Sequence, residues 1–346
     1  MFIKRYQEHK RYLSKKPEKI LWIFPLICNL RCNHCDIGKL MMVGKGGKPS
    51  DGLILKENKK IIDRLSKWIG KPYSLSFIAG EPLMHEDMLE TVKYATERGA
   101  VTSLTSNGTL IQNLNIAEKI VKSKLEYMAL SLDSMNAKIH DQSRGVLGTH
   151  QKVMKAVELL QEAKSKLKSK TPKIYINAII MKENLDEIRN MIKWSKKAKV
   201  DGITFQPIAS KEFFSSKSEY GGRWYVNNPV WPAYKDVINL IDYMEEMKQN
   251  GYPLQNSEGD FIRFRQYFKN PETFGKMNVC VGSLGTLVIS PKGKASVCMS
   301  EALGDILTDD LDQIWFSQQS EKAKRRVSKC EAQCKILACN KDDFYF

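Results

Sequence analysis

The sequence lacks the features that would direct a chain into or across a membrane. No apolar run is long enough to span a bilayer, since the longest one near the start, residues 20–28, is far too short. That run follows Lys15, Lys16 and Lys19 without a small-residue cleavage site, so we expect no signal peptide. We also find no internal repeat and no low-complexity tract. These absences favour a cytoplasmic protein with no membrane span.

Cysteine is absent from the whole of residues 36–279, although the chain has eight cysteines. Three lie at 28–35 and five at 280–339. Thiols that only fill a core would scatter along the chain, so this clustering indicates two separate cysteine sites. Without an export signal the compartment is reducing, which argues against disulfides and for metal or cluster ligation.

The overall composition is that of a soluble globular protein. The 346 residues are 42% hydrophobic and 27% charged, enough for one barrel-sized domain and a smaller module. The net charge of +16 raises nucleic-acid binding as one alternative. However, much of the excess is lysine on expected helix faces, as in 164–173, so we expect a solvated surface and no nucleic-acid partner.

A strand-then-helix rhythm runs from residue 20 to about 207. We predict strands at 20–24, 73–78, 101–105, 127–132, 174–181 and 202–205, and helices at 57–68, 87–98, 114–123, 150–166 and 185–197. Six such units predict an α/β fold with a parallel sheet, either a barrel or an open doubly wound sheet. In both, functional loops follow the carboxyl ends of the strands.

The rhythm stops after residue 207, which divides the chain into three predicted regions. Residues 18–207 form the α/β domain. Residues 208–275 connect it to the rest, with Ser, Gly, Asn and Pro at 208–232 and a helix at 232–249. Residues 276–346 form a small cysteine-rich module with a short strand at 286–289.

The first cysteine group, Cys28, Cys32 and Cys35, has the spacing C-x3-C-x2-C in a loop after the first predicted strand. Three thiolates in one loop can hold three corners of a 4Fe–4S cluster and leave one iron open. Zinc is the alternative, but zinc sites usually take four ligands and favour C-x2-C pairs.

This spacing and its place after a strand resemble the hallmark of the radical S-adenosylmethionine (radical SAM) enzymes. The resemblance implies a partial (β/α)6 TIM-like barrel whose open iron binds S-adenosylmethionine. It also implies the activity, in which S-adenosylmethionine is cleaved reductively to a 5′-deoxyadenosyl radical that abstracts a hydrogen atom from substrate. By the same resemblance His34, just before the third cysteine, lies near the adenine as a packing variant and is not a metal ligand.

Two further motifs resemble cofactor-binding segments of that family. Ala79-Gly80-Glu81-Pro82 follows the second strand, where the family has Gly-Gly-Glu-Pro, so Gly80 and Glu81 are implied to hold the amino group of the methionine moiety. Ala79 replaces the first glycine. Alone, this tetrapeptide would more often be an ordinary turn.

Ser131-Leu132-Asp133 with a later Arg144-Gly145 resembles a second family pattern. It implies that Ser131 contacts the cofactor and that Arg144 pairs with its carboxylate. The alternative is a surface ion pair for Arg144 and a helix cap for Asp133. The segment 105–109 resembles the family's Thr-Asn-Gly and is also a turn signal, while Gln206 is a weaker candidate to face the substrate.

The second cysteine group resembles the SPASM and twitch extensions of the family, which carry auxiliary iron–sulfur clusters. Cys280 and Cys298 flank Gly293 in the pattern C-x12-G-x4-C, and three more thiols follow, Cys330, Cys334 and Cys339. A full SPASM domain has seven cysteines, so five predict one auxiliary 4Fe–4S cluster held by Cys280, Cys298 and two of the other three. Two clusters, or a structural zinc, are the alternatives.

The resemblance predicts an oxidoreductase-type radical SAM enzyme whose auxiliary cluster accepts an electron or positions the substrate. We expect a peptide or protein substrate and a reducing partner such as flavodoxin or ferredoxin. No evident peptide-recognition domain precedes the barrel, which keeps a small-molecule dehydrogenase or epimerase, acting on a sugar-like or natural-product substrate, as the alternative. RNA modification and a non-catalytic iron–sulfur or zinc protein are further alternatives.

Overall fold

The structure is a computed structural model that describes residues 15–42, 44, 47–48, 51–70, 72–210, 223–277, 280, 285–298 and 301–337. Its centre is one nine-stranded sheet in the order β6-β5-β4-β3-β2-β1-β7-β8-β9. Strands β1 to β6 are all parallel and do not close on themselves, so they form the expected partial barrel. The six strands are β1 (Lys19–Ile23), β2 (Tyr73–Ile78), β3 (Ala100–Ser106), β4 (Tyr127–Ser131), β5 (Lys173–Ile180) and β6 (Gly202–Pro207).

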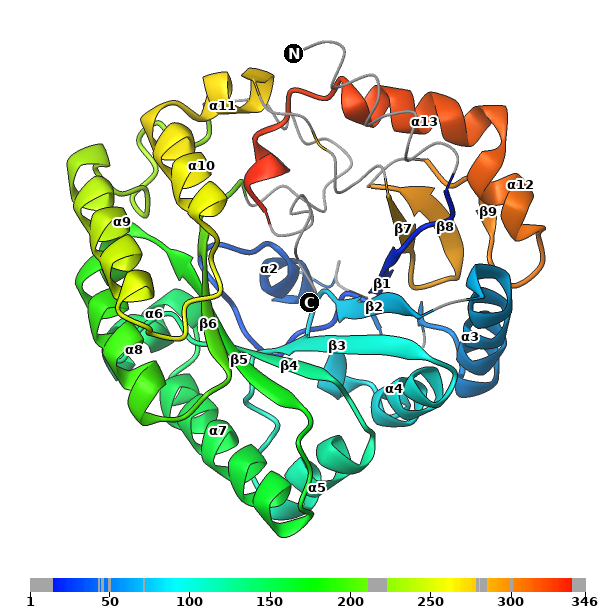
Figure 1. Ribbon diagram of the computed structural model, residues 1–346, viewed down its shortest axis with the longest axis horizontal. Helices are drawn as coiled ribbons and strands as arrows, with labels where there is room; N and C mark the ends of the chain where they lie inside the picture. Colours follow the sequence, from blue (N-terminus) through cyan, green and yellow to red (C-terminus); the bar gives the residue numbers. More distant parts are fainter. Residues whose placement is uncertain are drawn as a thin grey trace.

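Helices cover the outer face of this sheet (Figure 1). The helices that the sequence predicted are α3 (Leu55–Ile69), α4 (Met88–Glu97), α5 (Leu114–Lys122), α7 (Thr149–Lys166), α8 (Leu185–Lys197) and α9 (Tyr234–Gln249). Each has an apolar face at helical spacing, as the sequence pattern predicts. The predicted bounds of these helices and strands are within two residues of the observed ones.

Six helices were not predicted from the sequence: α2 (Ile37–Met42), α6 (Ala137–Arg144), α10 (Glu258–Lys269), α11 (Pro271–Met277), α12 (Leu311–Phe316) and α13 (Gln318–Ser328). Most are short or polar, so they show little apolar periodicity. Helix α6 is typical, because it buries polar side chains and is preceded by the N-cap residue Asn136, whose side chain accepts from the Lys138 N–H.

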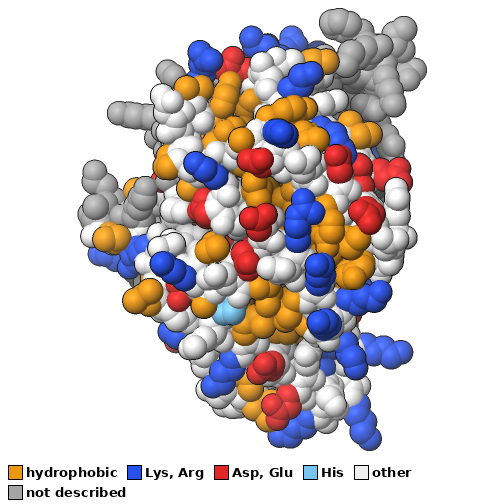
Figure 2. Space-filling view, turned by 90° about the vertical axis from the view of Figure 1, so that its left-hand side faces the viewer, with side chains coloured by type: hydrophobic (Ala, Val, Ile, Leu, Met, Phe, Trp, Pro, Cys, Tyr) orange, Lys and Arg blue, Asp and Glu red, His pale blue; other side chains and the backbone are white. Residues whose placement is uncertain are grey.

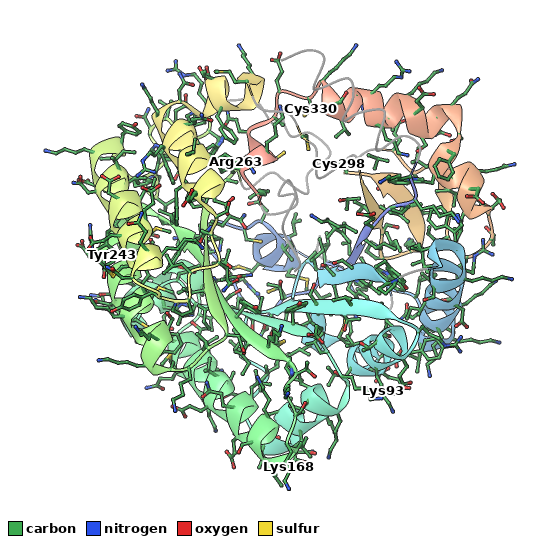
Figure 3. The ribbon with its side chains drawn as sticks, viewed as in Figure 1. Lys93, Lys168, Tyr243, Arg263, Cys298 and Cys330 are labelled. Carbon is green, nitrogen blue, oxygen red and sulfur yellow. The ribbon has the colours of Figure 1, made fainter. Side chains whose placement is uncertain are left out.

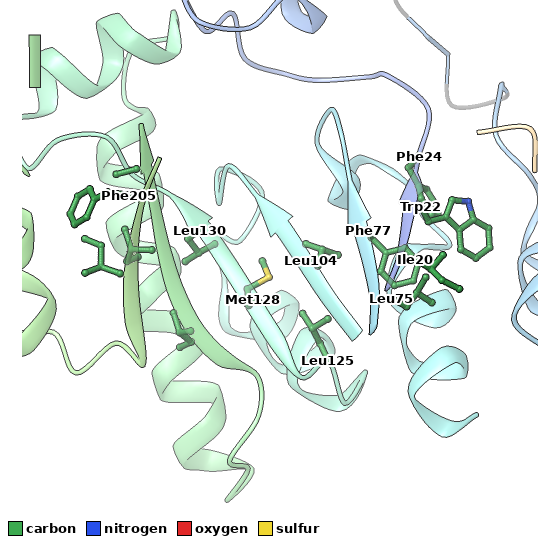
Figure 4. Close-up of a cluster of buried hydrophobic side chains, with 14 of the residues drawn as sticks. Ile20, Trp22, Phe24, Leu75, Phe77, Leu104, Leu125, Met128, Leu130 and Phe205 are labelled. Carbon is green, nitrogen blue, oxygen red and sulfur yellow. The ribbon is translucent and has the colours of Figure 1, made fainter. Parts of the chain in front are cut away.

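The core between the sheet and its helices is built from alternate strand residues. Ile20, Trp22 and Phe24 lie beside Leu75 and Phe77 of the neighbouring strand (Figure 4). The rings of Trp22 and Phe77 are stacked with centroids 6.0 Å apart. Each such side chain contributes about 1.5–3 kcal/mol by leaving water, so this cluster fixes β1 against β2 and holds the loop that follows β1.

The C-terminal region extends the barrel sheet. Strand β7 (Thr286–Ile289) pairs in parallel with β1. Strand β8 (Lys294–Val297) is antiparallel to β7, and β9 (Gly304–Asp305) is antiparallel to β8. The first barrel strand and the C-terminal region are therefore joined through main-chain hydrogen bonds.

At the opposite edge of the sheet, β6 is capped by a segment of the connecting region. The Asn256 side chain accepts from the Phe205 N–H and donates to its carbonyl, which replaces a neighbouring strand. Pro207 then ends the strand without an N–H group. This edge offers few groups to a foreign strand.

The surface beside α8, α9 and α10 carries positive and negative side chains around scattered hydrophobic ones (Figure 2). This face fits the solvated surface expected from the lysine pattern. In the described part of the chain, no helix combines the length and the apolar character needed to cross a bilayer.

Candidate active site

The three cysteines of the N-terminal loop line one cavity of about 280 Å³. The rest of its wall comes from the carboxyl ends of the barrel strands and from the C-terminal region, including Gly80, Ser106, Asn107, Ser131, Arg144, Gln206 and Leu337. Residues expected to meet from four separate motifs are therefore brought together. A second cavity, of about 600 Å³, lies beside β1 and α3 and is lined by no described cysteine, so size alone does not mark the site.

The donor set in this cavity suits an iron–sulfur cluster. Burial raises the pKa of the Cys28 thiol to about 11 and raises those of Cys32 and Cys35 as well, so binding a cluster releases protons. Three sulfurs face one space that also contains polar groups for a second ligand. Around no point in the described part of the chain do three His, Cys, Asp or Glu side chains converge to hold a single metal ion.

His34 also lines the cavity, between the second and third cysteines. Its Nδ1 lies 3.1 Å from the Asn33 side-chain oxygen, and Asn33 in turn donates to Glu183. These contacts link the imidazole to the loop itself. The predicted role of His34 beside the adenine remains a prediction.

Glu81 is completely buried directly behind the cavity wall. Its carboxylate accepts hydrogen bonds from the Ser106 hydroxyl at 2.8 Å, the Asn107 N–H at 2.7 Å and the Leu83 N–H at 3.1 Å. Burial nevertheless raises its pKa to about 7, because none of these partners carries a positive charge. An ammonium group placed nearby would stabilise the ionised carboxylate.

Arg144 forms a buried ion pair, which differs from a surface loop contact. Its Nε lies 2.7 Å from Asp133 Oδ2, and the two side chains are 9% and 0% exposed. Asp133 also accepts from the Ser143 hydroxyl and the Ile179 N–H. Burial alone would raise the pKa of Asp133, but Arg144 and the nearby histidines hold it well below its usual range. Arg144 lines the cavity together with Cys32, and its charge opposes the rise in the pKa of the Cys32 thiol that burial causes.

The segment after β3 has a larger role than the sequence indicated. The Asn107 side chain donates to Asn29 at 2.8 Å and accepts from the Thr109 N–H, and Asn29 donates to the Thr109 hydroxyl. Asn107 Nδ2 is also 4.0 Å from the Cys28 sulfur. This network ties the cysteine loop to β3. Its sequence signals were the resemblance to the family's Thr-Asn-Gly segment and the Asn-Gly turn, and neither reveals a long-range partner.

Four of the five C-terminal cysteines are described, and Cys339 lies outside the described residues. Cys280 is buried, and Cys298, which follows β8, has a positive φ of 55°. Figure 3 shows Cys298 and Cys330 toward the same inner region of the C-terminal part. Cys330, Cys280 and Cys334 all lie near the buried Lys335, whose pKa burial lowers and these thiols raise. Three of the described thiols are therefore close enough to Lys335 to influence its charge.

In comparisons with known proteins, both the barrel and the C-terminal cysteine region match a described family. Residues 22–195 match the radical SAM superfamily, and residues 280–340 match the SPASM family, an iron–sulfur cluster-binding domain. The chain is 26% identical to AdoMet-dependent heme synthase of Methanosarcina barkeri over 95% of its length and 90% of that protein. With the heme synthase of Oleidesulfovibrio alaskensis it is 31% identical over 91% of its length and 78% of the relative.

A relative with a different activity and a solved structure complete the comparison. The PqqA peptide cyclase of Granulibacter bethesdensis is 23% identical over 65% of this chain and 54% of that protein. The fold is similar to that of Streptococcus suis SuiB bound to its precursor peptide SuiA, with a TM-score of 0.65 at 17% identity over 99% of this chain and 77% of that one.

These matches and the cysteine geometry agree on the cofactors, which are S-adenosylmethionine with its 4Fe–4S cluster and auxiliary iron–sulfur ligation near the C-terminus. The chain belongs to the radical SAM superfamily and carries a SPASM domain.

Proposed function

We propose that this protein is a radical SAM oxidoreductase that removes a hydrogen atom from a peptide or protein substrate held at the carboxyl ends of the barrel strands. The observation that carries the proposal is the shared cavity of Cys28, Cys32 and Cys35 with Gly80, Ser131 and Arg144. When bound, the cluster supplies the electron that breaks a carbon–sulfur bond of S-adenosylmethionine, giving methionine and the 5′-deoxyadenosyl radical.

The chain's own residues would orient the methionine moiety. The Gly80 backbone and the Glu81 carboxylate would hold its ammonium, which supplies the positive charge that buried Glu81 lacks. Ser131 and the Arg144 guanidinium would hold its carboxylate, with Asp133 fixing the orientation of Arg144. In this arrangement the carboxyl of Glu81 serves as an anion and donates no proton.

The oxidative outcome rests on the C-terminal cysteines. Hydrogen abstraction leaves a substrate radical and 5′-deoxyadenosine. Loss of one more electron, to the auxiliary cluster, and of a proton would complete a two-electron oxidation of the substrate. Cys280, Cys298 and two of Cys330, Cys334 and Cys339 would hold that cluster. A flavodoxin or ferredoxin would supply the electron that starts the reaction.

A peptide suits the cavity because its wall is mostly uncharged. Ile179, Ile208, Ala209 and Leu337 form an apolar part, and Gln206 adds an amide. Among the described lining residues Arg144 is the only lysine or arginine, and Asp133 and the carboxylate of S-adenosylmethionine would already occupy it. A substrate with many carboxylates would be left without cationic partners there. The match to a PqqA peptide cyclase supports the same class.

A tetrapyrrole is the second candidate, because the matches to two heme synthases span 95% and 91% of this chain. Titration of the reconstituted protein with Fe-coproporphyrin III, followed by the Soret band, separates the two candidates. A saturable shift at micromolar ligand, with faster 5′-deoxyadenosine formation, would support the tetrapyrrole and overturn the peptide. No shift would support the peptide.

The radical chemistry itself is tested on anaerobically reconstituted protein treated with dithionite and S-adenosylmethionine. About eight irons per chain and formation of 5′-deoxyadenosine would support one auxiliary 4Fe–4S cluster beside the first. About four irons with the same product would assign the C-terminal cysteines to zinc or to structure. Zinc in place of iron, with no cleavage, would overturn the proposal.

Two cysteine variants separate the roles of the two groups. Cys32→Ala is expected to abolish 5′-deoxyadenosine formation and to keep the auxiliary cluster, because it removes one ligand of the open-iron site. Cys298→Ala is expected to retain some cleavage of S-adenosylmethionine while losing substrate oxidation. Iron content and 5′-deoxyadenosine are measured for both, and normal substrate oxidation by Cys298→Ala would show that the auxiliary cluster has no catalytic part.

A further inference from the structure

The cysteine loop lies against three glycines that come from three separate parts of the fold. These are Gly38 in α2, Gly80 after β2 and Gly145 after α6. A Cβ atom added to each would lie 2.2 Å from the Leu30 carbonyl oxygen, 2.2 Å from that of Ile27 and 2.3 Å from that of Arg31, respectively. Such distances are impossible for real side chains, so each contact requires glycine.

Main-chain hydrogen bonds accompany these close contacts. The Arg31 N–H donates to the Arg144 carbonyl at 3.0 Å, and the Asn33 N–H donates to the Ser143 carbonyl at 2.9 Å. On the other side of the loop, the Glu81 N–H donates to the Ile27 carbonyl at 2.8 Å. The loop is therefore fixed through its backbone by β2 and α6, independently of its cysteine side chains.

We infer that Gly38, Gly80 and Gly145 form a cradle that holds Cys28, Cys32 and Cys35 in a ligating arrangement before any cluster is bound. The three contacts fall on the carbonyls of residues 27, 30 and 31, which lie between and beside the first two cysteines. Ordering a loop costs conformational entropy. Because the cradle orders the loop when the protein folds, the cluster binds a preorganised site. The glycines are positioning residues, and the inference rests on the proposed function only in taking the ligand to be an iron–sulfur cluster.

The sequence contains a matched control for Gly145. Gly148 also has a positive φ, 78° compared with 70° for Gly145, but a Cβ there would meet nothing within 4 Å. Alanine imposes similar backbone strain at both positions, so only Gly145→Ala adds the collision with the Arg31 carbonyl. We expect Gly145→Ala to lower cluster affinity by about 10-fold or more, the size of effect seen when supports of metal ligands are removed, and Gly148→Ala to bind iron as the wild type does.

A second pair of glycines tests the collision at positions where the backbone is helical and not left-handed. Gly38 lies inside α2 and would collide with the Leu30 carbonyl, whereas Gly259 lies inside α10 and has only an ordinary 3.6 Å contact with Ser257. Alanine favours helix at both positions. Gly38→Ala is expected to lose cluster iron, and Gly259→Ala is expected to keep it.

Two measurements on each variant decide the matter. Iron and sulfide after reconstitution are expected to fall from about eight toward about four per chain only in the two cradle variants. In apoprotein, peptide mass spectrometry after iodoacetamide pulses is expected to show faster alkylation of the three loop cysteines only in those variants, with far-UV circular dichroism unchanged. Equal iron and alkylation within both pairs would overturn the cradle, as would equal losses in Gly145→Ala and Gly148→Ala.

The outcomes also separate the cradle from the proposed function. If wild-type protein fails to cleave S-adenosylmethionine while the glycine pairs still differ in iron and alkylation, the function fails and the cradle stands. If cleavage occurs and each cradle variant matches its control in both measurements, the cradle fails and the function stands.

Discussion

At the scale of single residues, Ala79 shows how the site is shaped by backbone conformation. Its φ is 75°, in the left-handed region that glycine adopts without strain. The family pattern has glycine at this position, so the departure noted in the sequence falls on a position where glycine has a physical advantage. Gly80, the next residue, also has a positive φ, of 60°. Two consecutive left-handed residues turn the chain sharply after β2 and bring the Glu81 carboxylate beneath the cavity.

The buried carboxyl of Glu81 predicts a pH dependence of stability in apoprotein. Its pKa rises from 4.5 to about 7 on folding, so the folded state binds the proton more tightly. This contribution is fully present below pH 4.5 and is lost as pH rises to about 7, a total of about 3 kcal/mol. Glu81→Gln removes it, so from pH 5 to pH 7.5 the unfolding free energy of the variant should rise relative to that of the wild type.

The measurement is urea unfolding of both apoproteins at the two pH values. His140, whose pKa burial lowers to about 4, changes stability over the same range in both proteins, so only the difference between them reports on Glu81. A difference that is the same at pH 5 and pH 7.5 would contradict the prediction.

The site residues that were predicted from the sequence are those that lie in short, recognisable motifs. Cys28, Cys32 and Cys35 lie within one loop, and Gly80, Ser131 and Arg144 lie in short motifs at strand ends, which the parallel sheet brings to one edge. The ion pair of Asp133 with Arg144 was not predicted, because it depends on how α6 folds back toward β4, and the contact of Asn107 with Asn29 was not predicted, because the two residues are distant in sequence. No local pattern encodes such partners.

At the scale of helices and strands, three helices are followed by a lysine whose backbone has a left-handed conformation that favours glycine. Lys124, Lys168 and Lys199 each follow the last turn of α5, α7 and α8 with φ values of 59°, 50° and 52°. Glycine occupies the corresponding positive-φ positions after α3 and α4, at Gly70 and Gly99. The lysines thus contribute charge at the cost of backbone strain.

Replacing all three lysines by glycine is expected to stabilise the protein. A left-handed backbone conformation costs a non-glycine residue about 1–2 kcal/mol. Glycine avoids this strain, but it makes the unfolded chain more flexible, which lowers stability by about 0.4–1 kcal/mol. The net gain is about 0.5 kcal/mol per position, measured as a higher Tm. Lys155→Gly, at an exposed position inside α7, is the control and should lower stability by about 1 kcal/mol. A triple variant that melts at or below the wild-type temperature would contradict the strain argument.

The strands were predicted more completely than the helices, for a physical reason. Strands β1 to β6 are largely buried and appear in the sequence as short, mostly apolar runs. Helix α6 buries polar residues instead, among them Asp141, which accepts from the Thr149 hydroxyl and the Gly148 N–H. Tertiary hydrogen bonds hold it in place, and the hydrophobic pattern carries no trace of them.

At the scale of the whole molecule, the sheet makes the barrel and the C-terminal cysteine region one continuous structure. β1 is covered by β2 on one side and by β7 on the other. The Trp315 indole also donates to the Lys15 carbonyl just before β1. The predicted division at residues 207 and 275 follows the sequence pattern, but the main-chain pairing crosses it.

Truncation tests the importance of this pairing. A chain ending at residue 277 leaves one edge of β1 uncovered, so it is expected to aggregate. A chain ending at residue 310 keeps β7 to β9 and loses Cys330, Cys334 and Cys339, and it should remain largely monomeric. Size-exclusion chromatography of the two purified chains gives the monomer fractions. Equal fractions would mean that β7 does not protect β1.

The pairing of β1 with β7 also has a consequence for synthesis. β1 leaves the ribosome before any other strand of the sheet, and β7 follows only after all six barrel strands have been made. At about 5–20 residues per second, β1 waits roughly 15 to 50 seconds for its second neighbour. During that interval the nascent barrel has an exposed edge beside the cysteine loop. The second edge of β1 is therefore covered only after residues 286–289 have been made.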